Sequence, residues 1–313
     1  SFLNVQQDFP ILFGCMFLAF LFSSSQDIAT DALAVNLLTP AERGIGNAIQ
    51  ASGNFLGAII GGGIVLVLFD QLGWQNSLWM IAIALSLCLL PTLFHREAII
   101  PKSTHSTGFR AYYQPFIRFF SRPKIWLWLI VVLLYLTAEN VSGTLIRPLL
   151  VDRGLSVAEI GQLLGIVSYI ARIIGALIAG TLITQWTKNK PRGLVARSSL
   201  VGFGVISNIA TLLYILPAVG FANSFLLYTI CIFVSGLQSM GYTALLAAMM
   251  DRADPEAAAT DYTTQISAAF LGITLTTVFA GRFAQTNGYV ATLIISVLIS
   301  LIAIVLIPKA QDV

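Results

Sequence analysis

Residues Ser23–Gly57 read SSSQDIATDALAVNLLTPAERGIGNAIQASGNFLG, and the beginning of this stretch places two carboxylates inside an apolar run. The run begins near Ile11 and is long enough to cross a lipid bilayer as a helix. Charged side chains are costly at bilayer depth, so Asp27 and Asp31 should face a protein interior or a water-filled cavity. The stretch therefore predicts a membrane helix with one polar face.

The polar residues of this first helix share that face. Ser23, Asp27 and Asp31 follow one another at four-residue spacing, which places them on the same side of a helix. Gln26 and Thr30 lie beside them. We expect this face to line an internal cavity.

A proline and a charged pair separate this helix from the next. Pro40 interrupts the helical pattern, and Glu42 and Arg43 follow it before a second apolar run begins. We expect Glu42 and Arg43 to belong to a charged gate network at the cytoplasmic surface.

The composition is typical of a protein that crosses the membrane many times. Of the 313 residues, 57% are hydrophobic and only 10% are charged, and the mean hydropathy is +0.85; no ordinary soluble domain of this length has this balance. The net charge of +3 is too small to predict a nucleic-acid partner. The sequence contains no cysteine or histidine spacing typical of a metal site and no phosphate-binding glycine loop, so neither a metal nor a cofactor is predicted.

Polar interruptions divide the chain into nine apolar stretches of helix length. Strands of a membrane barrel would need only about ten residues each, with strict alternation. The predicted fold class is therefore an all-α membrane protein. The expected spans are residues 11–37, 44–69, 75–94, 125–150, 158–186, 194–218, 224–250, 261–283 and 288–308.

One connection between the spans is long and basic. Placing residues 96–124 in the cytoplasm leaves few basic residues on the other side, as the positive-inside rule requires. This divides the chain into residues 1–95, a cytoplasmic linker at residues 96–124, and residues 125–313.

The first two spans recur as the seventh and eighth. A shift of 215 residues aligns them without a gap. Repetition in the same sense indicates two parallel halves of six helices each, the arrangement of major facilitator transporters. The aligned pairs include Pro40 with Pro255, Gln50 with Gln265, Ser52 with Ser267, and Phe55-Leu56-Gly57 with Phe270-Leu271-Gly272.

Three helices precede the linker and six follow it. The same shift would place the counterpart of the fourth span about 90 residues before Ser1. We therefore expect nine of the twelve helices of a major facilitator fold, with the first three missing from a parent of about 400 residues. Residues 1–95 would hold family helices 4 to 6, and residues 125–313 family helices 7 to 12. The alternative is a natural chain of nine helices.

Polar stripes mark the helices expected around a central cavity. In this architecture the first, fourth, seventh and tenth family helices line the cavity, and the last three of these correspond to the first, fourth and seventh spans here. Those spans carry the polar stripes. The candidate cavity residues are Gln26 and Thr30 of the first span, Tyr135, Asn140 and Arg147 of the fourth, Arg172 of the fifth, and Gln238 and Tyr242 of the seventh.

Three carboxylates are candidates for proton coupling: Glu139, Asp27 and Asp31. Desolvation disfavours the charged form of a carboxyl group, so each could exchange a proton near neutral pH, as a proton-coupled carrier requires. The alternative roles are structural. Either aspartate could cap a helix end or pair with Arg43, and Glu139 could pair with Arg172.

The two arginines within the spans have competing roles. Arg147 and Arg172 could bind an anionic substrate or neutralise a carboxylate. We favour neutralisation slightly.

Several short segments carry a family resemblance: Ser25–Asp31 with Glu42-Arg43-Gly44, Leu150–Gly154 with Glu159-Ile160-Gly161, Gly236–Leu245, and Phe270-Leu271-Gly272. They resemble the AmpG-type muropeptide permeases and the related acetyl-CoA transporters of the major facilitator superfamily. The resemblance implies proton-driven import of N-acetylglucosaminyl-anhydro-N-acetylmuramyl peptides across a bacterial inner membrane by alternating access. Glu139 falls where an aspartate is expected in the bacterial permeases, a departure that keeps the acid.

Two other functions compete with muropeptide import. One is a carrier of acetyl-CoA or another anionic metabolite, and the other is a membrane receptor or scaffold that transports nothing. An enzyme is not expected, because no histidine lies in a predicted span and Asp27 and Asp31 share one helix. The expected partners are a small-molecule substrate, protons and the lipid bilayer.

Overall fold

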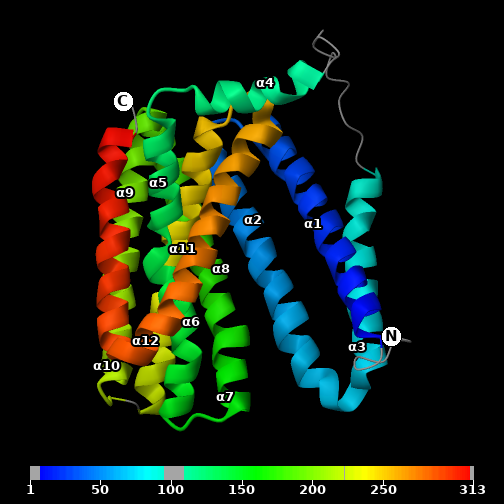
Figure 1. Cartoon of the computed structure of the whole chain (residues 1–313), viewed down its shortest axis with the longest axis vertical. Helices are drawn as coiled ribbons and strands as arrows, with labels where there is room; N and C mark the ends of the chain where they lie inside the picture. Colours follow the sequence, from blue (N-terminus) through cyan, green and yellow to red (C-terminus); the bar gives the residue numbers. More distant parts are fainter. Residues whose placement is uncertain (1–7, 95–108, 222, 311–313) are drawn as a thin grey trace.

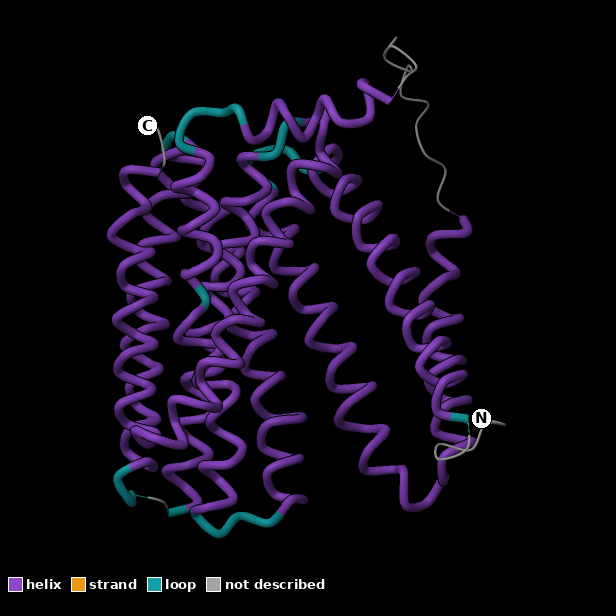
Figure 2. The backbone as a smooth tube through the Cα atoms, viewed as in Figure 1, coloured by secondary structure: helices purple, strands orange, loops and turns teal. Residues whose placement is uncertain are grey.

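The computed structural model describes residues 8–94, 109–221 and 223–310, which form a bundle of long helices (Figure 1). Figure 2 shows the same ranges coloured by secondary structure, and they contain no strand, which confirms the all-α prediction. Residues 96–108 of the predicted linker lie outside the described residues. The helical elements are α1 (Phe9–Leu37), α2 (Arg43–Ala58), η1 (Ile59–Ile64), α3 (Val65–Phe94), α4 (Phe109–Phe120), α5 (Ile125–Tyr135), α6 (Thr137–Asp152), α7 (Val157–Gln162), η2 (Leu163–Val167), α8 (Ser168–Asn189), α9 (Arg192–Thr211), η3 (Leu212–Tyr214), α10 (Ile215–Ala218), α11 (Ser224–Arg252), η4 (Pro255–Ala257) and α12 (Ala258–Ala310).

Two glycines reverse the chain inside otherwise continuous helices. Gly73 in α3 has φ 69° and ψ 177°, and Gly288 in α12 has φ 77° and ψ 172°. This backbone region is essentially restricted to glycine. The two glycines lie 215 residues apart, the shift that aligns the sequence repeat. The two halves therefore reverse direction at equivalent points, which supports the repeat.

With these reversals counted, the described residues form nine segments long enough to cross a membrane, as predicted. Seven helical stretches are long and apolar enough by composition alone, and Gly288 divides the last of them, Pro255–Ala310, in two. The ninth segment is α2 with its continuation to Gly73. It is less apolar than the others because it carries Asn47 and Gln50.

The helices after α4 form the better-packed part of the molecule. In the most apolar 18-residue segment of α11, 72% is buried, whereas none of the corresponding segment of α1 is buried. Trp128 and Tyr262 are fully buried between the later helices. By contrast, α1 lies at the edge of the bundle (Figure 1) and exposes Phe13, Phe17 and Phe20.

Helix α2 packs against α8, and glycines set how closely the two helices approach. A Cβ atom on Gly44 would lie 2.8 Å from the carbonyl oxygen of Gly180, and one on Gly180 would collide with Ala48. Further along, a Cβ atom on Gly63 would lie 3.1 Å from the carbonyl oxygen of Gly165. Small residues permit close helix contact in membranes, so these glycines hold the first half against the second.

Helix α4 crosses one end of the bundle (Figure 1). Arg118 anchors it to η4, the short connection between α11 and α12, with nitrogen–oxygen distances of 3.1 Å to Asp254 and 3.4 Å to Glu256. Arg122 pairs with the fully buried Asp261. The arginines and polar residues of this segment predict only a polar linker, but aromatic residues recur at helical spacing among those arginines and are consistent with the observed helix.

Candidate functional site

A cavity of about 560 Å³ lies between the two halves of the described chain. Helices α6, α8 and α11 supply most of its wall, and α2 contributes one aromatic side chain. Its lining combines charged, hydroxyl and aromatic groups, which is typical of a small-molecule site. The lining residues are Phe55, Glu139, Asn140, Gly143, Thr144, Ile146, Arg147, Leu164, Ser168, Tyr169, Arg172, Tyr214, Ser235, Gln238 and Thr277.

An ion pair forms the centre of this wall. The Arg172 guanidinium donates to the Glu139 carboxylate at 2.5 Å, the arrangement that the sequence offers as the structural alternative to proton coupling. Arg172 also donates to the Gln238 side-chain oxygen at 3.3 Å. The Gln238 amide nitrogen in turn donates to Ser142 at 3.0 Å and to Thr211 at 2.9 Å. Side chains of four helices, α6, α8, α9 and α11, therefore hold the pair in one orientation.

Two buried oxygens of the cavity wall have no hydrogen-bond partner among the described residues. They are Oε2 of Glu139 and Oγ of Ser168. Buried polar atoms are normally hydrogen-bonded, so each is available to a donor that enters the cavity. Ser168 is only 4% exposed.

Phe55 of α2 brings the first half of the chain into the site. The Arg172 guanidinium carbon lies 5.6 Å from the Phe55 ring centroid, within the range of a cation–π interaction. The same ring lies 6.0 Å from Tyr169 and 6.2 Å from Tyr242. The ion pair of the second half is therefore in direct contact with the first half.

Arg147 lines the same cavity but differs from Arg172 in its surroundings. It is exposed to the cavity, and no carboxylate of the described residues lies within ion-pair distance of it. The favoured expectation was neutralisation by a carboxylate, and the structure shows that arrangement for Arg172 alone.

The tyrosines predicted for the cavity have other surroundings. Tyr135 is buried and donates to the carbonyl oxygen of Leu200 at 2.8 Å, so it ties α5 to α9. Tyr242 is half-buried. Its ring packs near that of Phe55, and it is not among the residues that line the cavity. Asn140 and Gln238 lie in the wall, as predicted.

The polar face of α1 does not reach this cavity. Asp31 is buried and accepts a hydrogen bond from the Gln50 amide at 2.6 Å. Asp27, Gln26 and Thr30 are exposed. Gln26 borders a separate hollow between α1 and α3.

The expected gate residues separate into two roles. Arg43 pairs with Asp251 of α11 at 3.0 Å, and Arg192 of α9 approaches the other oxygen of Asp251 at 2.8 Å. Glu42 does not join this cluster. It accepts hydrogen bonds from the Thr39 hydroxyl and the Thr39 backbone nitrogen, and these hold the pKa of Glu42 below its ordinary value.

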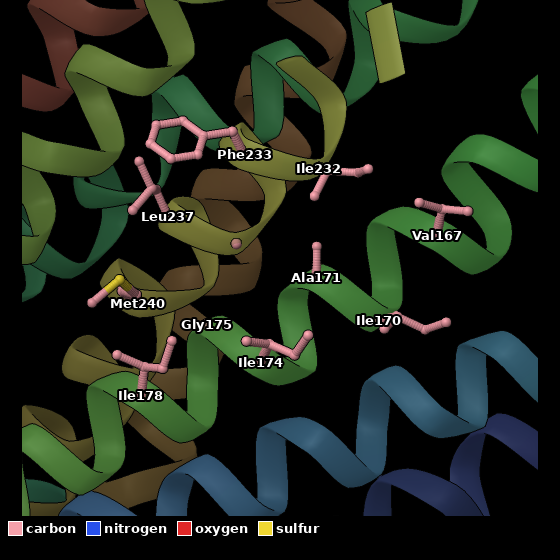
Figure 3. Close-up of a pocket in the computed structure, with 11 residues that line it drawn as sticks. Val167, Ile170, Ala171, Ile174, Gly175, Ile178, Ile232, Phe233, Leu237 and Met240 are labelled. Carbon is pink, nitrogen blue, oxygen red and sulfur yellow. The ribbon is translucent and has the colours of Figure 1, made fainter. Parts of the chain in front are cut away.

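A second hollow, between α8 and α11, is entirely apolar. Figure 3 shows Ala171, Ile174 and Ile178 on α8 opposite Phe233 and Met240 on α11. Five hydrogen-bonding side chains of these two helices line the first cavity instead: Ser168, Tyr169 and Arg172 of α8, and Ser235 and Gln238 of α11. We therefore place the functional site in the first cavity.

The aromatic part of the site is not predicted by the sequence pattern. Phe55, Tyr169 and Tyr214 lie in apolar stretches whose periodicity is equally typical of packing. A hydrophobic pattern alone does not separate a cavity aromatic from a core aromatic. In the described ranges no three potential metal ligands come together.

Comparison with known proteins identifies the family. The sequence profile described as Major Facilitator Superfamily matches residues 1–265. The chain belongs to the major facilitator superfamily. A crystal structure of a bacterial homologue of the iron transporter ferroportin, in an outward-facing state, has a similar fold, with a TM-score of 0.62. The two sequences are 21% identical, and the structural match covers 96% of this chain and 73% of the ferroportin homologue.

The curated proteins that this chain resembles include permeases. The chain is 28% identical over 269 residues to an anhydromuropeptide permease of Escherichia coli strain K12, covering 85% of this chain and 53% of the permease. It is 23% identical over 298 residues to the putative transporter AmpG 4 of Rickettsia conorii, covering 90% of this chain and 68% of the relative. The chain thus spans about half the length of the Escherichia coli relative. It is a multi-pass membrane protein of a transporter family, not an enzyme.

Proposed function

We propose that this protein is a proton-coupled secondary transporter that imports anhydromuropeptides across the bacterial inner membrane. The observation that carries the proposal is the Glu139–Arg172 ion pair in the wall of a polar, aromatic cavity between the two halves. The similarity to anhydromuropeptide permeases supports the substrate class.

The ion pair supports proton coupling because its charges depend on each other. When Glu139 binds a proton, Arg172 loses its charged partner, and the balance of its contacts with Gln238 and Phe55 changes. Because Phe55 belongs to the first half, this change acts on the contact between the halves. A ligand or proton that interacts differently with the two states of such a contact shifts their populations, which is the basis of alternating access.

The cavity also suits a sugar–peptide substrate. Its volume lies within the usual range of ligand pockets, about 300–1,000 Å³. Phe55 and Tyr169 line the cavity with aromatic side chains that can contact a sugar, and the unpartnered oxygens of Glu139 and Ser168 can accept hydrogen bonds from hydroxyl or amide groups.

Uptake of labelled anhydromuropeptide into proteoliposomes containing the full-length protein tests the proposal. We expect uptake that requires a pH gradient and falls at least about tenfold in Glu139→Gln. Glu159→Gln is the matched control, because Glu159 lies in a helix-capping box with Ser156 that glutamine also completes.

Uptake in Glu139→Gln with an unchanged gradient requirement would show that Glu139 is structural. If the unmodified protein bound acetyl-CoA and transported no muropeptide, the substrate would be an anionic metabolite instead. Binding of muropeptide without any flux would indicate a receptor.

A further inference from the structure

Three charged side chains line the first cavity, and their charges do not cancel. Glu139 and Arg172 neutralise each other at 2.5 Å. Arg147 lies in the same wall with no carboxylate partner among the described residues. Among the described residues, the cavity lining therefore carries one uncompensated positive charge.

An unpaired guanidinium at such a position calls for an anion. Arginine within a membrane segment is costly and usually pairs with an acidic group or faces water. Its planar array of donors fits a carboxylate with two parallel hydrogen bonds. The group that best completes the surroundings of Arg147 is therefore a carboxylate carried by the substrate.

The position of Arg147 along α6 sets a minimum size for that substrate. Eight residues separate Glu139 from Arg147, which corresponds to about 12 Å along a helix axis. Gly143 lies between them in the cavity wall, and the space where its side chain would be is open. A compact anion can reach only one of the two positions, whereas a ligand with a sugar body and a peptide can span both.

We propose that Arg147 is the specificity-determining residue that binds a carboxylate of the substrate peptide, while the uncharged sugar part lies toward Ser168 and the Glu139–Arg172 pair. This inference rests on the proposed function, since it assigns one part of an anhydromuropeptide to one end of the same cavity. It separates two tasks: Arg147 selects the substrate, and Glu139 couples its movement to protons.

The test compares binding of two ligands at constant pH and without a gradient. One is the anhydromuropeptide with free peptide carboxylates, and the other is the same molecule with those carboxylates converted to amides. The full-length protein should bind the free acid at least about tenfold more tightly. Arg147→Gln should remove that preference and leave affinity for the amide nearly unchanged, while Arg147→Lys should retain part of it.

The control variant is Arg153→Gln. Arg153 donates to the carbonyl oxygens of Pro217 and Ala218 at a helix end, outside the cavity, so its loss should not affect the preference. Equal binding of acid and amide by the unmodified protein, or an unchanged preference in Arg147→Gln, would overturn the inference and leave the transport proposal standing. Failure to bind either ligand would overturn both.

Discussion

Hydrogen bonds from one threonine favour the ionised form of Glu42. The Thr39 hydroxyl donates to the Glu42 carboxylate at 2.6 Å and the Thr39 backbone nitrogen donates at 3.0 Å, and both bonds favour the ionised form. The pKa of Glu42 is therefore lower in the folded protein than its ordinary value of 4.5. A carboxylate with a lowered pKa contributes stability that is present above the ordinary value and is lost as the pH falls through the folded-state value.

We predict that Glu42→Gln lowers the melting temperature at pH 7, where the ionised carboxylate contributes stability, and makes thermal stability less dependent on pH below about 4.5. The measurement is the melting temperature of detergent-solubilised protein across this range. Thr39→Val is a matched variant, since it removes the hydroxyl donor and keeps the carboxylate, and it should reduce the same dependence in part. An identical slope in Glu42→Gln would contradict the prediction.

Equivalent residues of the repeat have different partners. Gln50 donates to Asp31 of α1, whereas its counterpart Gln265 accepts from the Trp128 indole nitrogen at 2.7 Å. The repeat predicted that both glutamines occupy matching places. It did not predict their hydrogen bonds, because each half supplies different neighbours.

At the scale of elements, the reversal at Gly288 has a specific backbone requirement. A side chain at φ 77° and ψ 172° is strained, and such a conformation costs about 1–3 kcal/mol for other residues. We predict that Gly288→Ala lowers the melting temperature in detergent by several degrees, as about 1–2 kcal/mol would in a protein of this size.

Gly281→Ala provides the control for this prediction. Gly281 lies in the same helix with open space around its Cβ position and no positive φ. Alanine there should leave the melting temperature unchanged or raise it slightly, because alanine has the higher helix propensity. Equal effects of the two substitutions would show that the reversal does not depend on the glycine backbone.

At the scale of the whole molecule, Asp251 joins the halves. It accepts from Arg43 of the first half and approaches Arg192 of the second, and all three side chains are less than one-fifth exposed. Together with the Gly44–Gly180 contact, this cluster joins the two halves at the end that carries α4. Charged hydrogen bonds of this kind contribute about 1.5–3 kcal/mol each.

We predict that Asp251→Asn shifts the full-length protein toward a state open at this end, by roughly tenfold or more in the equilibrium. The measurement is the distance distribution between spin labels at Asn36 and Lys190, which are exposed near the cluster, in a background without native cysteines. Asp152→Asn removes a carboxylate at the opposite end, where Asp152 accepts from Tyr289, and should leave this distribution unchanged. The prediction fails if the distribution is also unchanged in Asp251→Asn.

Much of the fold followed from the sequence. Apolar length and polar interruptions determined the all-α class and the nine spans, because a bilayer imposes a fixed thickness and requires internal backbone hydrogen bonding. Spacing along one helix also placed Glu139, Asn140 and Arg147 on a common face of α6, where the cavity lies.

Only the tertiary structure decided which side chains meet. Arg172 pairs with Glu139 across two helices, Phe55 reaches them from the other half, and Asp251 takes the place expected for Glu42 beside Arg43. Helical periodicity determines the direction in which a side chain points away from the axis of its own helix. The partner at the end of that side chain depends on how the helices cross, and here close glycine contacts set those crossings.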